Sequence, residues 1–150
     1  MNPANAHNEK KRLENPPAKF RLKIQRREKE GASVYWETFE LPYRRNLNVI
    51  SALMDVRKDP VTIEGKHTTP PVWDMSCLEQ VCGICTMVIN GRARQSCSAL
   101  VDNLDQPIKL EPMTKFPNIR DLIVDRSQMF DHLKRVHAWV ELDGSHDLGL

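Results

Sequence analysis

The first regular pattern along the chain is an alternation of apolar and polar residues in "KFRLKIQRRE" (19–28). Three apolar residues occupy every second position there: Phe20, Leu22 and Ile24. A period of two predicts a strand with one buried face. The segment "VYWETFEL" (34–41) follows the turn-like "KEGAS" and is rich in β-branched and aromatic residues. It predicts an antiparallel partner strand that Pro42 ends, because proline donates no hydrogen bond to a sheet.

The next pattern has the spacing of a helix. Val49, Leu53 and Val56 recur at intervals of three and four residues, which places them on one helical face. Asn48 directly precedes them, and an asparagine side chain is a favoured helix cap. We expect a helix from this cap through about Lys58, ended by the Asp-Pro pair that follows.

A hairpin is predicted in "TMVINGRARQS" (86–96). Residues 87–89 and 92–96 read as two strands, and Asn90-Gly91 matches a two-residue type I′ turn. Three polar side chains of the second strand could face a partner protein or solvent: Arg92, Arg94 and Gln95. The stretch "IKLEPM" (108–113) predicts a further strand.

A last helix is expected within "RDLIVDRSQMFDHLKRVHAWV" (120–140), although the pattern does not define its start. Four residues are available for its apolar face: Leu122, Met129, Leu133 and Val136. The order strand, strand, helix, loop, hairpin, strand describes a small sheet crossed by one helix, with a C-terminal helix after it. We therefore predict an α+β fold.

Composition bounds the class of protein. The chain has 150 residues, 40% of them hydrophobic and 28% charged, enough for one globular domain. The 22 basic and 20 acidic residues give a net charge of +2, which does not favour nucleic-acid binding. We expect residues 1–18 to form a disordered polar extension. It has no signal-peptide pattern, and no apolar run approaches the roughly 20 residues of a membrane span. We expect a cytoplasmic protein with reduced thiols.

All four cysteines lie within "CLEQVCGICTMVINGRARQSC" (77–97). Their spacing is Cys77-x4-Cys82-x2-Cys85-x11-Cys97. The hairpin folds Cys97 back toward the loop that carries the other three, so four sulfurs can converge. Thiolates are soft ligands that suit zinc or an iron–sulfur cluster.

The spacing favours a cluster over zinc. Structural zinc usually takes two close cysteine pairs, and only Cys82 and Cys85 form one here. A C-x4-C-x2-C loop with a distant fourth cysteine is typical of plant-type 2Fe–2S centres. Gly83 would let the loop backbone approach the cluster, because it has no side chain and tolerates positive φ. A Rieske centre is disfavoured, since no histidine lies within five residues of a cysteine. Zinc and redox-active thiols remain as alternatives.

The cysteine segment resembles that of the iron–sulfur subunits of succinate dehydrogenase and fumarate reductase. The similarity runs through "CLEQVCGICTMVINGRARQSCSALVD" (77–102), including the eleven-residue gap across an "ING" hairpin. "LPYRRNLNVISALMDVRKDP" (41–60) is similar to the family's first helix, and "FPNIRDLIVDRSQMF" (116–130) to the segment that closes its N-terminal domain. The resemblance covers roughly residues 19–147. It implies a β-grasp, 2Fe–2S ferredoxin-like sheet.

Carried over by position, the resemblance implies four cluster ligands: Cys77, Cys82, Cys85 and Cys97. By analogy with plant-type ferredoxins, the first two would share one iron and the last two the other. Many members have Arg where this chain has Leu78, and Ser where it has Ile84. Loss of that hydroxyl would remove one possible hydrogen bond near the cluster, so the potential of relatives does not transfer.

The resemblance also implies an activity. Succinate would be oxidised at the flavin of an FAD-containing partner subunit of succinate dehydrogenase, and the cluster would carry the electrons toward quinone. No catalytic side chain is expected in this chain. Fumarate reductase, a free-standing 2Fe–2S ferredoxin-like carrier and a zinc interaction module with four cysteine ligands are the alternatives.

The expected organisation follows from the same resemblance. Residues 1–18 would be the extension, 19–120 the 2Fe–2S ferredoxin-like domain, and 121–150 a helix and tail. That tail would lead to a C-terminal helical domain for which this chain has no cysteines, so the 4Fe–4S and 3Fe–4S sites of the family are absent. If that domain is supplied, a membrane-anchor cytochrome b subunit becomes a partner. The expected location is peripheral, at the cytoplasmic side of the cell membrane.

Overall fold

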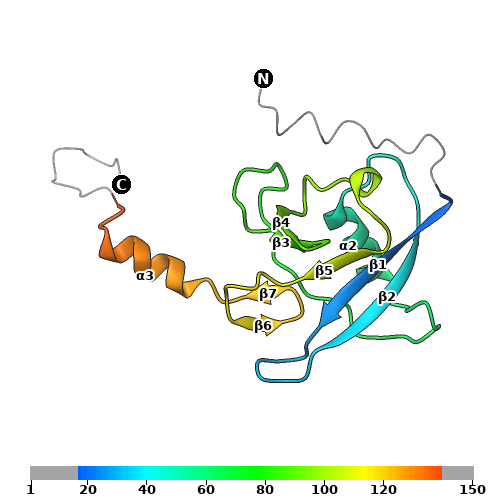
Figure 1. Cartoon of the computed structure of the whole chain (residues 1–150), viewed down its shortest axis with the longest axis horizontal. Helices are drawn as coiled ribbons and strands as arrows, with labels where there is room; N and C mark the ends of the chain where they lie inside the picture. Colours follow the sequence, from blue (N-terminus) through cyan, green and yellow to red (C-terminus); the bar gives the residue numbers. More distant parts are fainter. Residues whose placement is uncertain (1–16, 140–150) are drawn as a thin grey trace, which may run out of the picture.

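A five-stranded mixed sheet forms the centre of the molecule in the computed structural model, which describes residues 17–139 (Figure 1). Its strands are β1 (Lys19–Arg26), β2 (Tyr35–Pro42), β3 (Thr86–Ile89), β4 (Arg92–Gln95) and β5 (Ile108–Glu111). They lie in the order β2-β1-β5-β3-β4, and α2 (Val49–Lys58) crosses the sheet. The predicted α+β, ferredoxin-like fold is confirmed. Most of the predicted extension, residues 1–16, lies outside the described residues.

The order of the strands places the cysteine segment inside one long connection. β1 pairs antiparallel with β2 and parallel with β5. Parallel neighbours cannot be joined by a tight turn, so the chain passes through α2, the cysteine loop and the β3–β4 hairpin before it returns as β5. β5 then pairs antiparallel with β3. The loop that carries Cys77 and Cys82 therefore connects, along the chain, β1, β2 and α2 to the part of the sheet formed by β3, β4 and β5.

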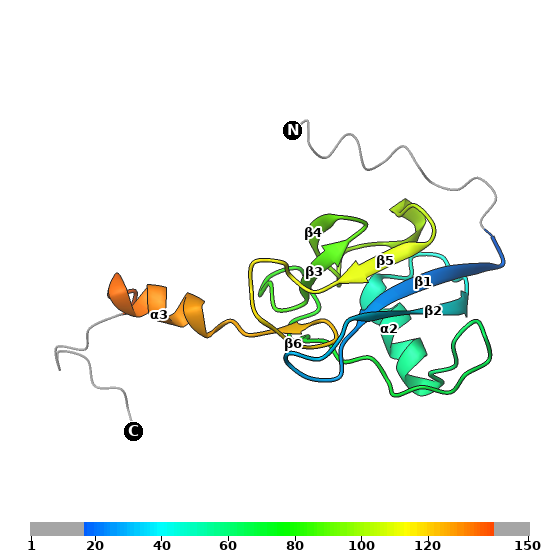
Figure 2. The ribbon, with the colours of Figure 1, turned by 60° about the horizontal axis from the view of Figure 1, so that its bottom comes forward.

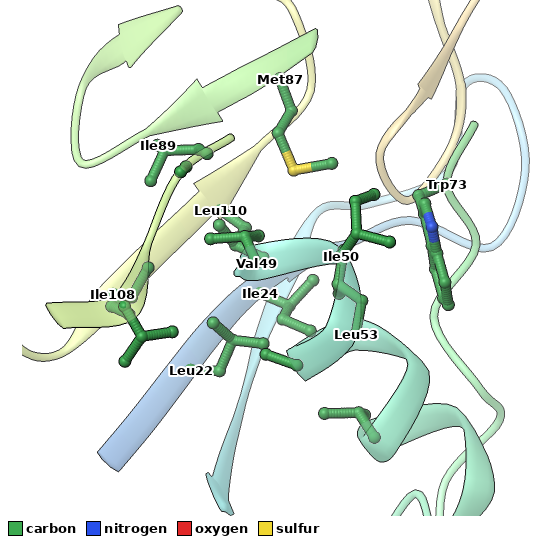
Figure 3. Packing of buried hydrophobic residues seen from close by; sticks show 14 of the residues in the cluster. Leu22, Ile24, Val49, Ile50, Leu53, Trp73, Met87, Ile89, Ile108 and Leu110 are labelled. Carbon is green, nitrogen blue, oxygen red and sulfur yellow. The ribbon is translucent and has the colours of Figure 1, made fainter. Parts of the chain in front are cut away.

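The core lies between α2 and the sheet (Figure 3). The inward residues of β1, Leu22 and Ile24, are fully buried, as the alternation predicted. Leu53 of α2 and Leu110 of β5 join them in the same cluster. The buried residues of α2 are Val49, Ile50, Ala52, Leu53 and Val56. The helical spacing predicted from the sequence is therefore correct.

Two local predictions from the sequence, a helix cap and a hairpin turn, also agree with the structure. The side-chain oxygen of Asn48 accepts a hydrogen bond from the Ser51 amide at 2.8 Å, which caps α2 as predicted. Asn90 and Gly91 have φ values of 48° and 77°, the two positive angles that a type I′ turn requires. The β3–β4 hairpin therefore has the geometry predicted from its turn.

The segment after β5 differs from the prediction. Residues 118–124 form a small hairpin, β6 (Asn118–Arg120) and β7 (Ile123–Val124), and α3 (Ser127–Arg135) begins only after it. Leu122 was expected on the helix, but it lies in the turn of this hairpin and is buried in the core. The assignment of Leu122 to the helix was therefore wrong. The division of the chain at residue 120 stays a prediction, and the β6–β7 hairpin spans that position.

A buried charged group ties this hairpin to the sheet. Arg26 occupies the next inward position of β1 after Ile24 and is 1% exposed. Its guanidinium donates to Asp121 in the β6–β7 turn at 3.0 Å, to Glu37 of β2, and to the Thr69 carbonyl at 2.9 Å. One cation thus joins β1, β2, the small hairpin and the loop that leads to the cysteines.

Helix α3 extends away from the sheet in both views (Figures 1 and 2). None of its residues is buried. The predicted apolar residues Met129 and Leu133 are about half exposed, and Val136 at the C-cap is 72% exposed. Within the described residues, their apolar face is therefore largely in contact with solvent.

Candidate metal centre

The four cysteines lie on the loop before β3 and just after β4. Cys77 and Cys82 belong to the loop, and Cys85 directly precedes β3. The first residue of β3 pairs with the last residue of β4, so the hairpin brings Cys97 next to Cys85. Ser96 reinforces this approach, because its amide and hydroxyl both donate to the Cys85 carbonyl, at 3.2 and 2.7 Å. Cys85 and Cys97 are buried, whereas Cys77 is half-buried and Cys82 exposed.

The sulfurs are arranged as two pairs. Hydrogen-bonding contacts link the thiols of Cys77 and Cys82 and those of Cys85 and Cys97, and Cys97 also lies near enough to Cys77 for their charges to repel. All four thiols lie in the described part of the chain and are free. Within residues 17–139, no three His, Cys, Asp or Glu side chains converge on one point suited to a single metal ion. A donor set of two thiol pairs matches the chemistry of a two-iron cluster, in which each iron takes two cysteines.

The backbone of the loop turns its N–H groups inward. Leu78, Gln80 and Gly83 all have positive φ, at 60°, 60° and 72°. Residues in this conformation, placed among ordinary ones, form concave nests of N–H groups that bind anions, including iron–sulfur clusters. The left-handed conformation costs a non-glycine residue about 1–2 kcal/mol. The loop therefore adopts it twice at a cost that other interactions must offset.

The cysteine sulfurs receive these N–H groups. The amides of Cys82 and Glu79 point at the sulfur of Cys77, at 3.3 and 3.4 Å. Together with the Val81 amide and the Cys82 thiol, they lower the pKa of Cys77 to about 7. Because the thiolate is the form that ligates metal, this environment prepares Cys77 for a ligand's role.

Burial affects the pKa values of the two buried thiols, Cys85 and Cys97, which form the inner pair. Burial opposes ionisation of Cys85, but hydrogen bonds from the Cys97 amide and thiol, and from Ser96, lower its pKa overall. Burial raises the pKa of Cys97, and the adjacent Cys85 adds to that rise. The Gln80 amide of the loop also points at Cys97. The far strand of the hairpin and the loop therefore interact at this sulfur.

Gly83 lies at the turn between the second and third cysteines. A Cβ added there would be 3.9 Å from the side chains of Gln95 and Thr86, which is ordinary van der Waals contact. The requirement for glycine thus comes from its φ of 72° and not from crowding. The side-chain oxygen of Gln95 is buried without a hydrogen-bond partner among the described residues.

The polar residues of β4 that were predicted to face a partner or solvent are not equivalent. Arg92 is exposed, whereas Arg94 and Gln95 are half-buried. Gln95 turns toward Gly83 of the cysteine loop. The alternative of a uniformly exposed polar strand therefore holds for Arg92 alone.

An apolar groove of about 330 Å³ runs from the cysteine loop to α3. Cys82 and Ile84 line one side, and Phe130 of α3 lines the other. Arg126, at the start of α3, also lines the groove and donates to the Ile84 carbonyl at 2.9 Å. No pattern in the sequence indicated this contact, because the two residues are 42 positions apart.

The family model described as "2Fe-2S iron-sulfur cluster binding domain" matches residues 19–131. The chain belongs to this family. The match confirms the resemblance predicted from the cysteine segment, and it favours the 2Fe–2S cluster over zinc as the cofactor. It covers the whole sheet, both cysteine pairs and the first half of α3.

Relatives within the family include subunits of two enzymes. The chain is 60% identical over 130 residues to the succinate dehydrogenase iron–sulfur subunit of Bacillus subtilis, covering 87% of this chain and 51% of the relative. It is 34% identical over 116 residues to the fumarate reductase iron–sulfur subunit of Mycobacterium tuberculosis, covering 77% and 44%. The chain thus spans about half the length of the curated relatives it matches.

A solved structure agrees on the fold. A chain of the "Mycobacterium smegmatis Sdh1 complex in the apo form" superposes with a TM-score of 0.66, covering 89% of this chain and 54% of that one. The sequence identity is 19%, so this likeness concerns the fold alone. None of the helices described between residues 17 and 139 has the length and apolar character that a membrane span needs.

Proposed function

We propose that Cys77, Cys82, Cys85 and Cys97 hold the 2Fe–2S cluster of this family. Cys77 and Cys82 would bind one iron, and Cys85 and Cys97 the other. The observation that carries this proposal is the arrangement of four free thiols in two pairs, with backbone N–H groups directed at their sulfurs. When bound, the cluster supplies one-electron redox chemistry.

The residues around the cysteines have a defined task in this proposal. The inward N–H groups of the loop offset negative charge on the thiolates, and that charge grows when the cluster is reduced. The β3–β4 hairpin holds the inner pair of cysteines in a buried position, where little solvent reaches them. Burial and hydrogen bonds are the protein's means of setting a cluster potential.

The proposed function is electron transfer within succinate dehydrogenase or fumarate reductase. The cluster would accept electrons one at a time from an FAD-containing flavoprotein subunit and pass them toward quinone and a membrane-anchor cytochrome b subunit. The names of the relatives support this assignment. In such an assembly the chain would be peripheral, at the cytoplasmic side of the cell membrane.

Anaerobic purification with iron and sulfide analysis tests the cluster. We expect about two irons and two sulfides per chain, and a spin-one-half EPR signal after reduction with dithionite. Stoichiometric zinc with no EPR signal would overturn the proposal.

A second experiment tests the enzyme that the cluster serves. The cluster-loaded chain is mixed with the flavoprotein subunit of succinate dehydrogenase, and succinate is added. We expect succinate to reduce the cluster only when the flavoprotein is present. Reduction by dithionite but never by succinate would favour the free-standing ferredoxin-like carrier.

A further inference from the structure

Arg126 links the start of α3 to the cysteine loop. Its Nη2 donates to the carbonyl oxygen of Ile84 at 2.9 Å. Ile84 lies between Cys82 and Cys85, which belong to different thiol pairs. The hydrogen bond therefore holds the short turn that connects the two halves of the proposed ligand set.

The surroundings of Arg126 strengthen the electrostatic interactions that its charge makes. Among the described residues that line the groove between the loop and α3, it is the one charged side chain, with Cys82, Gly83 and Phe130 as neighbours. Arg126 is half-buried as a whole residue, and its hydrogen bond to Ile84 lies at the surface. Charges interact more strongly beside apolar groups than in open water, because the effective dielectric constant is lower. The nearby carboxylate of Asp125 is directed at another group, because it accepts a hydrogen bond from the Ser127 amide at 2.8 Å.

Anchoring of α3 alone does not account for this arrangement. The helix buries none of its residues, so it gains little from being fixed. The bond is directed at the cysteine loop and places a permanent cation there. An arginine remains charged at every accessible pH.

We infer that Arg126 is a positioning residue for electron transfer by the cluster. It holds the Cys82–Cys85 turn through the Ile84 carbonyl and places a positive charge that favours the reduced state. The inference rests on the proposed function, since it concerns the same cluster. One-electron reduction, by dithionite in the test, adds one negative charge to the cluster and forms or breaks no bond. A neighbouring cation stabilises that added charge.

Three substitutions separate the charge from the hydrogen bond. Arg126→Gln retains a side-chain donor but no charge, Arg126→Lys retains the charge without the planar fork, and Arg126→Met removes both. The midpoint potential of each purified, cluster-loaded chain is measured by EPR-monitored redox titration. The matched control is Arg135→Gln, which removes the same charge from the exposed last turn of α3. Nine residues of helix separate the two positions by roughly 13 Å.

We expect the Gln and Met variants to be reduced at more negative potentials than the unmodified chain. The Lys variant should remain close to the unmodified chain, and the Arg135→Gln control should not shift. We also expect the Met variant to lose iron to a chelator several-fold faster, because the turn between the thiol pairs is no longer held.

Two results would overturn the inference while leaving the proposed function intact. One is an unchanged potential in the Gln variant, and the other is an equal shift in the Gln and Lys variants, which a purely structural role would produce. An unmodified chain that binds no cluster would instead overturn the proposed function itself. If the Met variant does not fold, the comparison of Gln with Lys still decides the question.

Discussion

Arg26 and Asp121 form an ion pair in which both side chains are 1% exposed, with 3.0 Å between Nε and Oδ1. The same carboxylate accepts hydrogen bonds from the amides of Arg27 and Val72, both at 3.0 Å. Val72 is followed by Trp73, which packs into the core four residues before Cys77 (Figure 3). The ion pair thus holds the base of the cysteine loop against the sheet.

We expect Asp121→Asn to lower the free energy of unfolding by roughly 1.5–3 kcal/mol, because a neutral amide replaces one of the two carboxylates that accept charged hydrogen bonds from the buried Arg26 guanidinium, and only Glu37 remains as its counter-charge. Urea unfolding followed by circular dichroism measures this loss. The matched control is Glu40→Gln, which breaks the exposed ion pairs of Glu40 in β2 with Lys19 and Arg21 of β1. It should cost far less, since solvent screens exposed pairs. Equal losses in the two variants would contradict the role assigned to the buried pair.

The ligand set predicts the effect of Cys97→Ser. A serine oxygen is a harder and weaker ligand for iron than a thiolate, and the sequence has no fifth cysteine that could replace Cys97. We expect loss of most of the bound iron, or a cluster with an altered absorption spectrum, measured after anaerobic purification. Ser98→Ala, at the exposed neighbouring position, should retain a full complement of iron. An unchanged cluster in Cys97→Ser would mean that the fourth ligand lies elsewhere.

Backbone conformation predicts the effect of Gly83→Ala. Alanine in the left-handed conformation costs about 1–2 kcal/mol, and the site has room for the added methyl group. We therefore expect the cluster to assemble more slowly and to be lost faster. Absorbance during reconstitution with iron and sulfide measures both rates.

Gly31→Ala is the control for this strain, because Gly31 has a φ of 75° in the turn between β1 and β2 and also has open space around it. It should show a similar loss of stability with normal cluster assembly. If both variants assemble the cluster equally slowly, the effect belongs to the fold as a whole and not to the loop.

Removal of the cluster should affect the loop and spare the sheet. The apolar core between α2 and the sheet includes Cys85 and Cys97 among its residues, but its centre at Leu22, Leu53 and Leu110 contains no proposed ligand. Leu78 and Gln80, by contrast, hold costly positive φ values around the cysteines. We expect hydrogen exchange measured by mass spectrometry to accelerate across residues 77–84 after chelation, with β1 and α2 still protected. Loss of protection throughout the chain would show that the metal is needed for the whole fold.

Local chemistry made the sheet, α2 and the hairpin predictable. The alternation at Leu22 and Ile24, the cap at Asn48 and the turn at Asn90-Gly91 each act over a few residues. The spacing of the cysteines likewise contains the information about the cofactor, because the hairpin between Cys85 and Cys97 could itself be predicted.

Long-range contacts account for what was missed. Alternation places Arg26 on the inward face of β1, but its charge alone argues for solvent, and its partner Asp121 is 95 positions away. The β6–β7 hairpin has strands of only three and two residues. It depends on that partner and on Leu122 in the core, so no local pattern predicts it, and the spacing of Leu122 from Met129 instead suggests a helix. The inward N–H groups at Leu78 and Gln80 are also invisible in the sequence, because neither residue type favours positive φ.

Because β1 pairs in parallel with β5, the two halves of the sheet meet at these strands, and the cysteine loop is the covalent connection between the halves. A peptide-bond cut at Val81, which is 78% exposed, would separate β1, β2 and α2 from β3, β4 and β5. Cys77 would remain on the first piece, and the other three cysteines on the second. The two pieces would still share the interface between β1 and β5, and only their reassembled pair would carry all four sulfurs. The cluster would then link the two pieces, and its visible absorbance would report complementation between two separately produced fragments.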